Sequence, residues 1–175
     1  MSPTFEPGDK IFRSSLSNPI KRGQLILSIS PNLFDKELNR DGASYGLRCQ
    51  LSNAPFIGKV VNKVLIGAKS RHCGNFLWRI VGLPEERLQV TSQGRVSVDG
   101  QPLTEDYVVN WCTKNNTYAC PVFDGIVPKE SFFVLGDNRS NSWDSRYWPG
   151  NFIHRDDILS GIKSPHVKAE TTNRM

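Results

Sequence analysis

The side chains best able to do chemistry lie in one stretch, residues 136–146, which reads Gly-Asp-Asn-Arg-Ser-Asn-Ser-Trp-Asp-Ser-Arg. Its eleven residues include two carboxylates, two guanidiniums, two Asn and three Ser. An Arg fork holds a carboxylate through two parallel hydrogen bonds, so this set can fix a site in a defined geometry. The pattern favours a polar network that supports a catalytic or binding site. A surface loop with ordinary ion pairs is the alternative that the composition leaves open.

The cysteines and histidines offer a second source of chemistry. No pair of Cys has the Cys-x-x-Cys spacing, and the three His show no zinc spacing, so the sequence predicts no metal and no cofactor. Cys112 and Cys120 flank a polar, turn-like loop. A disulfide fits this pattern in an oxidising compartment, and two free thiols in neighbouring strands fit it equally well.

Short apolar or alternating runs separated by turn residues must position these groups. Such a pattern is typical of an all-β domain. Ser92-Gln93-Gly94 and Asp99-Gly100 are expected to be hairpin turns. The sequence therefore predicts a mainly β fold of antiparallel sheets with little helix. The expected strands are residues 10–13, 24–30, 87–91, 95–99, 101–103, 131–135 and 158–162.

The chain length suits one domain, which we expect over residues 1–163. Residues 31–75 differ in composition and are expected to form an insertion, with a short helix near Glu37 and another structured piece near Val60. The polar residues 164–175 are expected to be a disordered tail.

Charge and hydropathy restrict the partners. The net charge of +5 permits contact with an anionic membrane surface. The Lys and Arg are spread along the chain without a block of like charges, so no nucleic-acid binding is expected. No run approaches the roughly 18–20 apolar residues needed to span a bilayer, so no transmembrane segment is expected in this chain.

Residues 136–146 resemble the Gly-Asp-Asn-Arg-x-Asn-Ser-x-Asp-Ser-Arg box of signal peptidase I, also called leader peptidase, at every specified position. Three further segments resemble other boxes of that family in the same order: Met1–Asp9, Arg22–Gln24 and Arg79–Glu86. Residues 98–103 and 127–128 are similar to its cyanobacterial and plastid-like members. The resemblance implies a β-rich serine endopeptidase that removes signal peptides from exported precursor proteins.

Two positions depart from the family pattern. The family's Ser nucleophile stands immediately before the Met that corresponds to Met1, so its position precedes this chain, and Ser2 is too far along the strand to replace it. The family's Lys general base corresponds to Trp78, and an indole has no basic nitrogen. A misplaced start of the sequence would explain the missing Ser but not the Trp at position 78. Trp78 is therefore the stronger of the two reasons to expect a catalytically inactive relative. Among residues 31–75, Lys59, Lys63 and Lys69 are candidates for an alternative base.

The resemblance also implies roles for the remaining site residues. Ser142 corresponds to the Ser that bonds the family Lys, Asp144 and Arg146 to a structural ion pair, and Asp137 and Arg139 to groups that shape the site. One wall of the substrate groove corresponds to Pro3, Thr4 and Phe5. The strand that would pair with an extended peptide corresponds to Phe76, Leu77 and Trp78.

Three hypotheses follow. The chain is a degenerate signal peptidase that binds signal-like peptides or a partner without cleaving them, an active membrane-anchored signal peptidase with a misplaced start and an unusual base, or an unused remnant. By resemblance, the expected partners are precursor proteins that carry signal peptides. The expected location, also by resemblance, is membrane-associated, on the periplasmic or thylakoid-lumen side.

Overall fold

The computed structural model describes residues 4–5, 9–29, 75–113, 120–148 and 150–163 of the chain. The strands within these residues form two antiparallel sheets. The large sheet has the strand order β1-β10-β2-β3-β8-β9, and the small sheet has the order β6-β5-β4-β7. The large-sheet strands are β1 (Phe12–Ser14), β10 (Ile158–Lys163), β2 (Leu25–Ile29), β3 (Asn75–Gly82), β8 (Ser131–Leu135) and β9 (Ile153–His154). The small-sheet strands are β6 (Gln101–Pro102), β5 (Val96–Val98), β4 (Arg87–Val90) and β7 (Phe123–Ile126).

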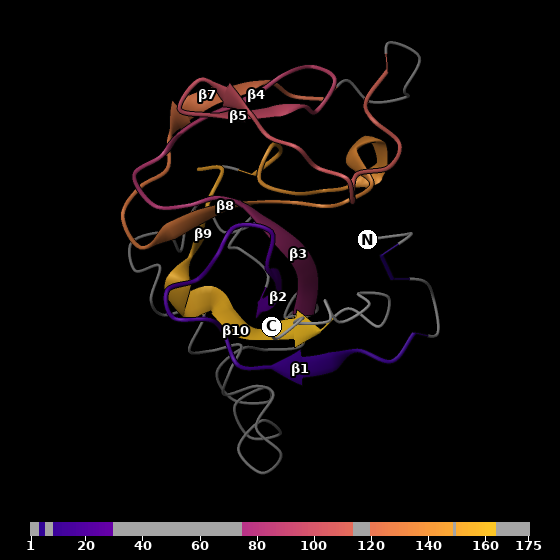
Figure 1. Ribbon diagram of the computed structural model, residues 1–175, viewed down its shortest axis with the longest axis vertical. Coiled ribbons are helices and arrows are strands. Elements are labelled where there is room, and N and C mark those ends of the chain that lie inside the picture. The colour runs from indigo at the N-terminus through magenta and orange to yellow at the C-terminus, as the bar shows by residue number, and fades with distance from the viewer. Residues whose placement is uncertain (1–3, 6–8, 30–74, 114–119, 149, 164–175) are drawn as a thin grey trace, which may run out of the picture.

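The central strand β8, and β3 from Trp78 onward, are buried on both faces. Because side chains alternate across a strand, Phe132 and Val134 enter one apolar cluster while Phe133 and Leu135 enter another. The second cluster also contains Leu88 and the valines of β4 and β5, so it joins the two sheets. In Figure 1 the small sheet lies above β3 and β8, and β1, β2 and β10 lie below them.

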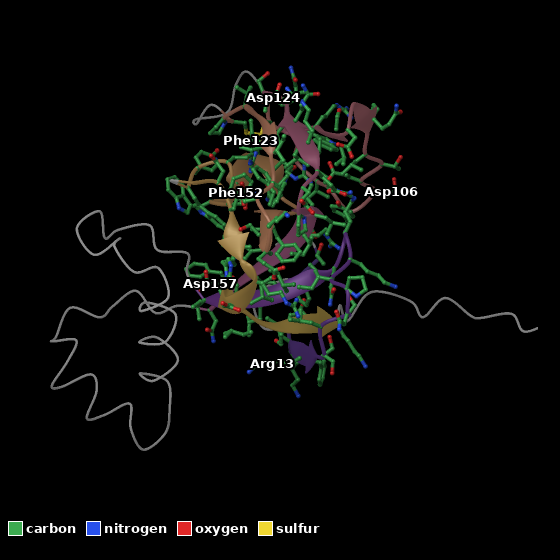
Figure 2. All side chains as sticks on the ribbon, turned by 90° about the vertical axis from the view of Figure 1, so that its left-hand side faces the viewer. Arg13, Asp106, Phe123, Asp124, Phe152 and Asp157 are labelled. Carbon is green, nitrogen blue, oxygen red and sulfur yellow. A yellow bond between two sulfur atoms is a disulfide. The ribbon has the colours of Figure 1, made fainter. Side chains whose placement is uncertain are left out.

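Aromatic rings strengthen the contact between the sheets. Phe123 of β7 lies 4.7 Å from Phe133 of β8, measured between ring centroids. Phe152 lies 5.8 Å from Phe123 in an edge-on contact, and the two rings are labelled in Figure 2. Edge-on and offset aromatic pairs contribute packing beyond the apolar area that they bury.

The expected β class and low helix content are confirmed. Each expected strand overlaps an observed one, and Asp99 and Gly100 form the predicted turn with φ of 49° and 79°, as a tight hairpin requires. The helical turns of the described residues are two short 3-10 helices, η2 (Arg139–Asn141) and η3 (Arg155–Asp157). Three observed strands are not among those expected from the residue pattern: β3, β7 and β9. For β3, only the family resemblance implied a strand, at Phe76–Trp78. The strand β7 is half exposed and contains Asp and Gly, and β9 has only two residues.

Some expectations fall on residues outside the described ranges. These are the insertion up to residue 74, with its expected helix near Glu37, and the tail over residues 164–175. The single domain expected over residues 1–163 stays a prediction. Within the described ranges, no helix has the length and apolar character needed to cross a membrane.

Candidate functional site

The stretch 136–146, here called the box, follows β8, and its four charged side chains are buried although Trp143 is exposed. Asp137, Arg139 and Asp144 have no exposed surface, and Arg146 is 4% exposed. A solvated loop does not bury four charged side chains, since each must find a charged or hydrogen-bonding partner to offset its loss of water. The surface-loop alternative is therefore wrong, and the box is a buried polar network.

Asp144 and Arg146 form the ion pair that the resemblance implied. Arg146 Nε donates to Asp144 Oδ1 and Nη2 donates to Oδ2, each at 2.8 Å, and both side chains are fully buried. The carboxylate also accepts from the backbone N–H of Gly136 at 3.1 Å. This pair therefore closes the box on itself by joining its last residue to its first.

Arg139 is the largest fully buried side chain, and its partner lies outside the box. Its Nη2 donates to Glu105 Oε1 at 2.5 Å, and its Nη1 donates to Glu105 Oε2 at 3.2 Å. Its remaining donors reach the carbonyl oxygens of Gly94 and Gly136. The sequence analysis did not single out Glu105, because nothing in the local pattern showed that its carboxylate would be buried against the box.

Asp137 joins the box to β3 and to the N-terminal segment. Arg79 of β3 donates to it from Nε at 2.7 Å and from Nη2 at 2.6 Å, and both side chains are almost fully buried. The hydroxyl of Thr4 donates to the same carboxylate. Asp137 therefore holds Thr4 close to Arg79 of β3. The resemblance places Thr4 in one wall of the groove, beside that strand.

Residues 105–112, here called the bracing segment, run beside the box. The backbone N–H of Val109 donates to the carbonyl of Asp137 at 3.0 Å, and that of Arg139 donates to Val109 at 3.3 Å. Ser140 N–H donates to Asn110 at 2.9 Å. The bracing segment ends at Cys112, which forms a disulfide with Cys120, so the free-thiol alternative does not hold. Both sulfurs lie within 3.5 Å of Arg146 Nη1.

Tyr107 of the bracing segment was also missed. Its ring lies under the guanidinium of Arg79, with 4.0 Å between Arg79 Cζ and the ring centroid, and its hydroxyl donates to Glu105 at 2.9 Å. Burial raises the pKa of Tyr107 far above its usual range, and the charge of Glu105 raises it further. The phenol therefore stays a protonated donor at any physiological pH.

Trp78, which the resemblance places at the position of the family's base, faces the apolar core. It is 7% exposed, its ring stacks on Phe76 at 5.7 Å, and it meets Trp148 edge-on at 5.2 Å. Its indole N–H has no hydrogen-bond partner, so Ser142 does not bond this side chain. Ser142 lies instead against Gly136, where a Cβ would come within 2.2 Å of its hydroxyl oxygen, which excludes any other residue at 136.

The residues expected to bind substrate do not share one face of the large sheet. Phe76 and Trp78 stack on one face of β3, while Phe5 packs with Leu77 on the other. Pro3 lies outside the described residues. Asn75–Trp78 pair with β2, whereas pairing with β8 begins only at Arg79. Among the described strands, none covers this edge of Asn75–Trp78.

Comparison with known proteins identifies the family of the chain. Residues 1–167 match the family model described as signal peptidase, peptidase S26. The chain is 40% identical over 167 residues to signal peptidase I of Leptolyngbya laminosa, covering 91% of this chain and 60% of that protein. It is 40% identical over 87 residues to probable signal peptidase I-2 of Synechocystis sp., covering 48% of this chain and 34% of that protein.

The chain thus spans 60% or less of the length of these two relatives. A solved signal peptidase I from Enterococcus faecalis aligns with a TM-score of 0.49 and 22% identity, covering 85% of this chain and 100% of that chain. The match of the family model over nearly the whole chain, with the box intact and buried, leads to one conclusion: this chain belongs to the signal peptidase family, peptidase S26.

Proposed function

We propose that this chain is a non-catalytic member of its family that binds signal-peptide-like segments of exported precursor proteins. The observation that carries the proposal is the environment of Trp78. Its ring is packed between Phe76 and Trp148 in the apolar core, and its N–H is a donor that cannot accept a proton. A Ser nucleophile needs a neighbouring base, and this side chain cannot be that base.

The other lysines of the described residues do not replace it. A lysine serves as a general base at neutral pH when burial lowers its pKa. The described lysines, Lys10, Lys21, Lys129 and Lys163, are all exposed. Burial therefore cannot convert any of the four into a general base.

The geometry of β3 supports peptide binding without chemistry. The edge of Asn75–Trp78 that no described strand pairs with offers backbone N–H and C=O groups to an extended peptide, which would add to the large sheet as a further strand. The partly buried Leu77, backed by the buried Phe5, supplies apolar surface on one side of that edge, and Phe76, 39% exposed, supplies it on the other. Apolar surface on both sides suits the apolar segments of signal peptides.

The compartment that we propose is the periplasmic or thylakoid-lumen side of a membrane, where the relatives' substrates are exported. The Cys112–Cys120 disulfide agrees with this placement, because disulfides persist in oxidising compartments.

The second candidate is an active, membrane-anchored signal peptidase whose base lies outside the described residues. The observation that favours it is the completeness of the box, whose three buried Arg–carboxylate pairs are all formed. A site that had lost all function would not need this network. Its presence therefore fits an active enzyme, and it also fits an inactive protein in which the network holds a binding groove.

Cleavage of an Ala-x-Ala signal-peptide substrate separates the two candidates. The proteins compared are the chain extended upstream to include the genomic residues before Met1, and the same protein with Trp78→Lys. No turnover by the first and measurable turnover by the second supports a groove that lost only its base. Turnover by the unmodified extended chain overturns the non-catalytic proposal.

Binding is tested with a fluorescent, uncleaved version of the same peptide. We expect saturable binding to the wild-type chain by fluorescence anisotropy, because backbone pairing to β3 needs no catalytic group. The matched controls are two peptides methylated at alternate backbone nitrogens, one in each register, because successive N–H groups of a strand point to opposite sides and only one register removes the donors that face β3. Equal binding of the unmethylated peptide and both methylated peptides rules out strand addition at β3.

A further inference from the structure

Tyr107 contacts both Arg79 of β3 and Glu105, the partner of Arg139. Arg79 is held at its edges, since Nε and Nη2 donate to Asp137 and Nη1 donates to the carbonyl of Gly23 at 2.8 Å. The Tyr107 ring contacts the face of the same guanidinium. Hydrogen bonds in the plane of the guanidinium do little to stop it from tilting out of that plane. A ring against its face restricts this tilt, so the edge and face contacts together fix the orientation of the group.

The hydroxyl of Tyr107 fixes the ring in turn. It donates to Glu105, whose carboxylate is held by Arg139 of the box. The bracing segment that carries Tyr107 is itself paired to the box through Val109. The Tyr107 side chain is therefore fixed at its hydroxyl by Glu105 and at its backbone by the bracing segment. These contacts hold the ring under Arg79.

We propose that Tyr107 is a positioning residue of the peptide groove. It sets the orientation of Arg79, which orients Asp137, which holds Thr4 in the groove wall beside β3. This inference rests on the proposed peptide binding, but its first link, from Tyr107 to Arg79, concerns the free protein and is measured without peptide. Tyr107 acts through Arg79 and is not assigned a contact with the peptide.

The test compares three variants. Tyr107→Leu removes the ring, Tyr107→Phe keeps the ring and removes the hydroxyl, and Phe123→Leu is the matched control. Phe123 is a partly buried aromatic residue that packs on Phe133 and Phe152, on the far sheet from Arg79. Its substitution removes a comparable aromatic contact without touching the box.

Two readouts are used. The first is the rate at which the Arg79 Nε–H exchanges with water in a ¹⁵N-labelled protein, which reports the protection given by its bond to Asp137 and does not depend on the ring current of Tyr107. The second is affinity for the fluorescent Ala-x-Ala peptide. We expect Tyr107→Leu to raise the exchange rate and to weaken binding by about three- to tenfold, the range of a partly desolvated cation–π contact. Tyr107→Phe is expected to restore both readouts to near wild-type values, and Phe123→Leu to leave both unchanged.

The outcomes are distinct. If the Arg79 Nε–H exchange rate of Tyr107→Leu equals that of wild type, the positioning role is wrong. If Tyr107→Leu and Phe123→Leu weaken peptide binding equally, the effect is one of general stability and the role is again wrong. If wild type does not bind the peptide, the proposed function fails, and the exchange rate alone decides whether Tyr107 orients Arg79.

Discussion

Arg79 and Asp137, 58 residues apart in the chain, form a two-point ion pair that joins β3 to the box. Both side chains are almost fully removed from water, so neither charge can be left alone without a large penalty. The same carboxylate accepts from Thr4, which makes Asp137 the point where the N-terminal segment, β3 and the box meet.

Asp137→Asn is expected to lower the free energy of unfolding by about 3–5 kcal/mol, because it leaves the Arg79 guanidinium buried without a counter-charge. The measurement is urea denaturation at pH 7. Asp124→Asn is the control, since Asp124 pairs with Arg87 in an exposed pair and its loss should leave the curve close to wild type. Equal, small effects of both substitutions would show that Arg79 finds another partner or reaches water.

Trp78→Phe is expected to change the free energy of unfolding by less than about 1 kcal/mol. The substitution loses ring volume, but it also removes a buried N–H without a partner, whose penalty is about 1–3 kcal/mol. Trp78→Ala, which removes the whole ring, should cost about 3–5 kcal/mol. Denaturant melts of the three proteins check this, and a large loss in the Phe variant would mean that the indole N–H is bonded after all.

Trp78→Lys places an amine in the same apolar cluster, where burial lowers the pKa of a lysine below its ordinary value. The folded state then binds fewer protons than the unfolded state between those two pKa values, so the stability of the variant should rise as the pH is raised from 7 to about 10. The measurement is the denaturation midpoint against pH, with wild type as the reference. If the denaturation midpoint of the variant changes with pH in the same way as that of wild type, the side chain at position 78 is solvated and its amine is not buried in the cluster.

Reduction of the Cys112–Cys120 disulfide is expected to lower stability by about 2.5 kcal/mol, because the bridge closes a loop with a sequence separation of 8. Melts with and without dithiothreitol measure this difference. The double variant Cys112→Ser, Cys120→Ser should match the reduced protein and lose this response. An unchanged wild-type melt on reduction would show that the bridge does not contribute to stability.

Asp157 of η3 gives a pH-dependent prediction. Burial raises the pKa of this carboxyl, and the charge of Asp156 adds to the effect while that of His154 opposes it. A carboxyl with a raised folded-state pKa favours the fold at low pH, and this contribution is lost as the pH rises through that pKa. Asp157→Asn, whose position is labelled in Figure 2, should therefore raise the denaturation midpoint at pH 7 and leave it unchanged at pH 3. A midpoint lowered at pH 7 would contradict this sign.

Much of the fold could be predicted from local sequence. The apolar run Ser131–Leu135 and the Asp99-Gly100 turn specify a strand and a hairpin through neighbouring residues alone, since strand burial and turn geometry depend on short-range patterns. The box identified the family for the same reason, because its spacing is contained in eleven contiguous residues.

The partners of the box were decided only by the tertiary structure. Glu105 and Tyr107 are separated from Arg139 by more than 30 residues, and no local pattern marks an ordinary Glu or Tyr as buried. The edge of Asn75–Trp78 that no described strand covers likewise depends on where β8 ends beside β3. The sequence alone determined the β class and the family, and by resemblance it set Trp78 at the position of the family's base, because these are properties of residue type and short spacing. The folded chain decided which charges neutralise one another and which edge of β3 the described strands leave unpaired, because those depend on contacts between distant segments.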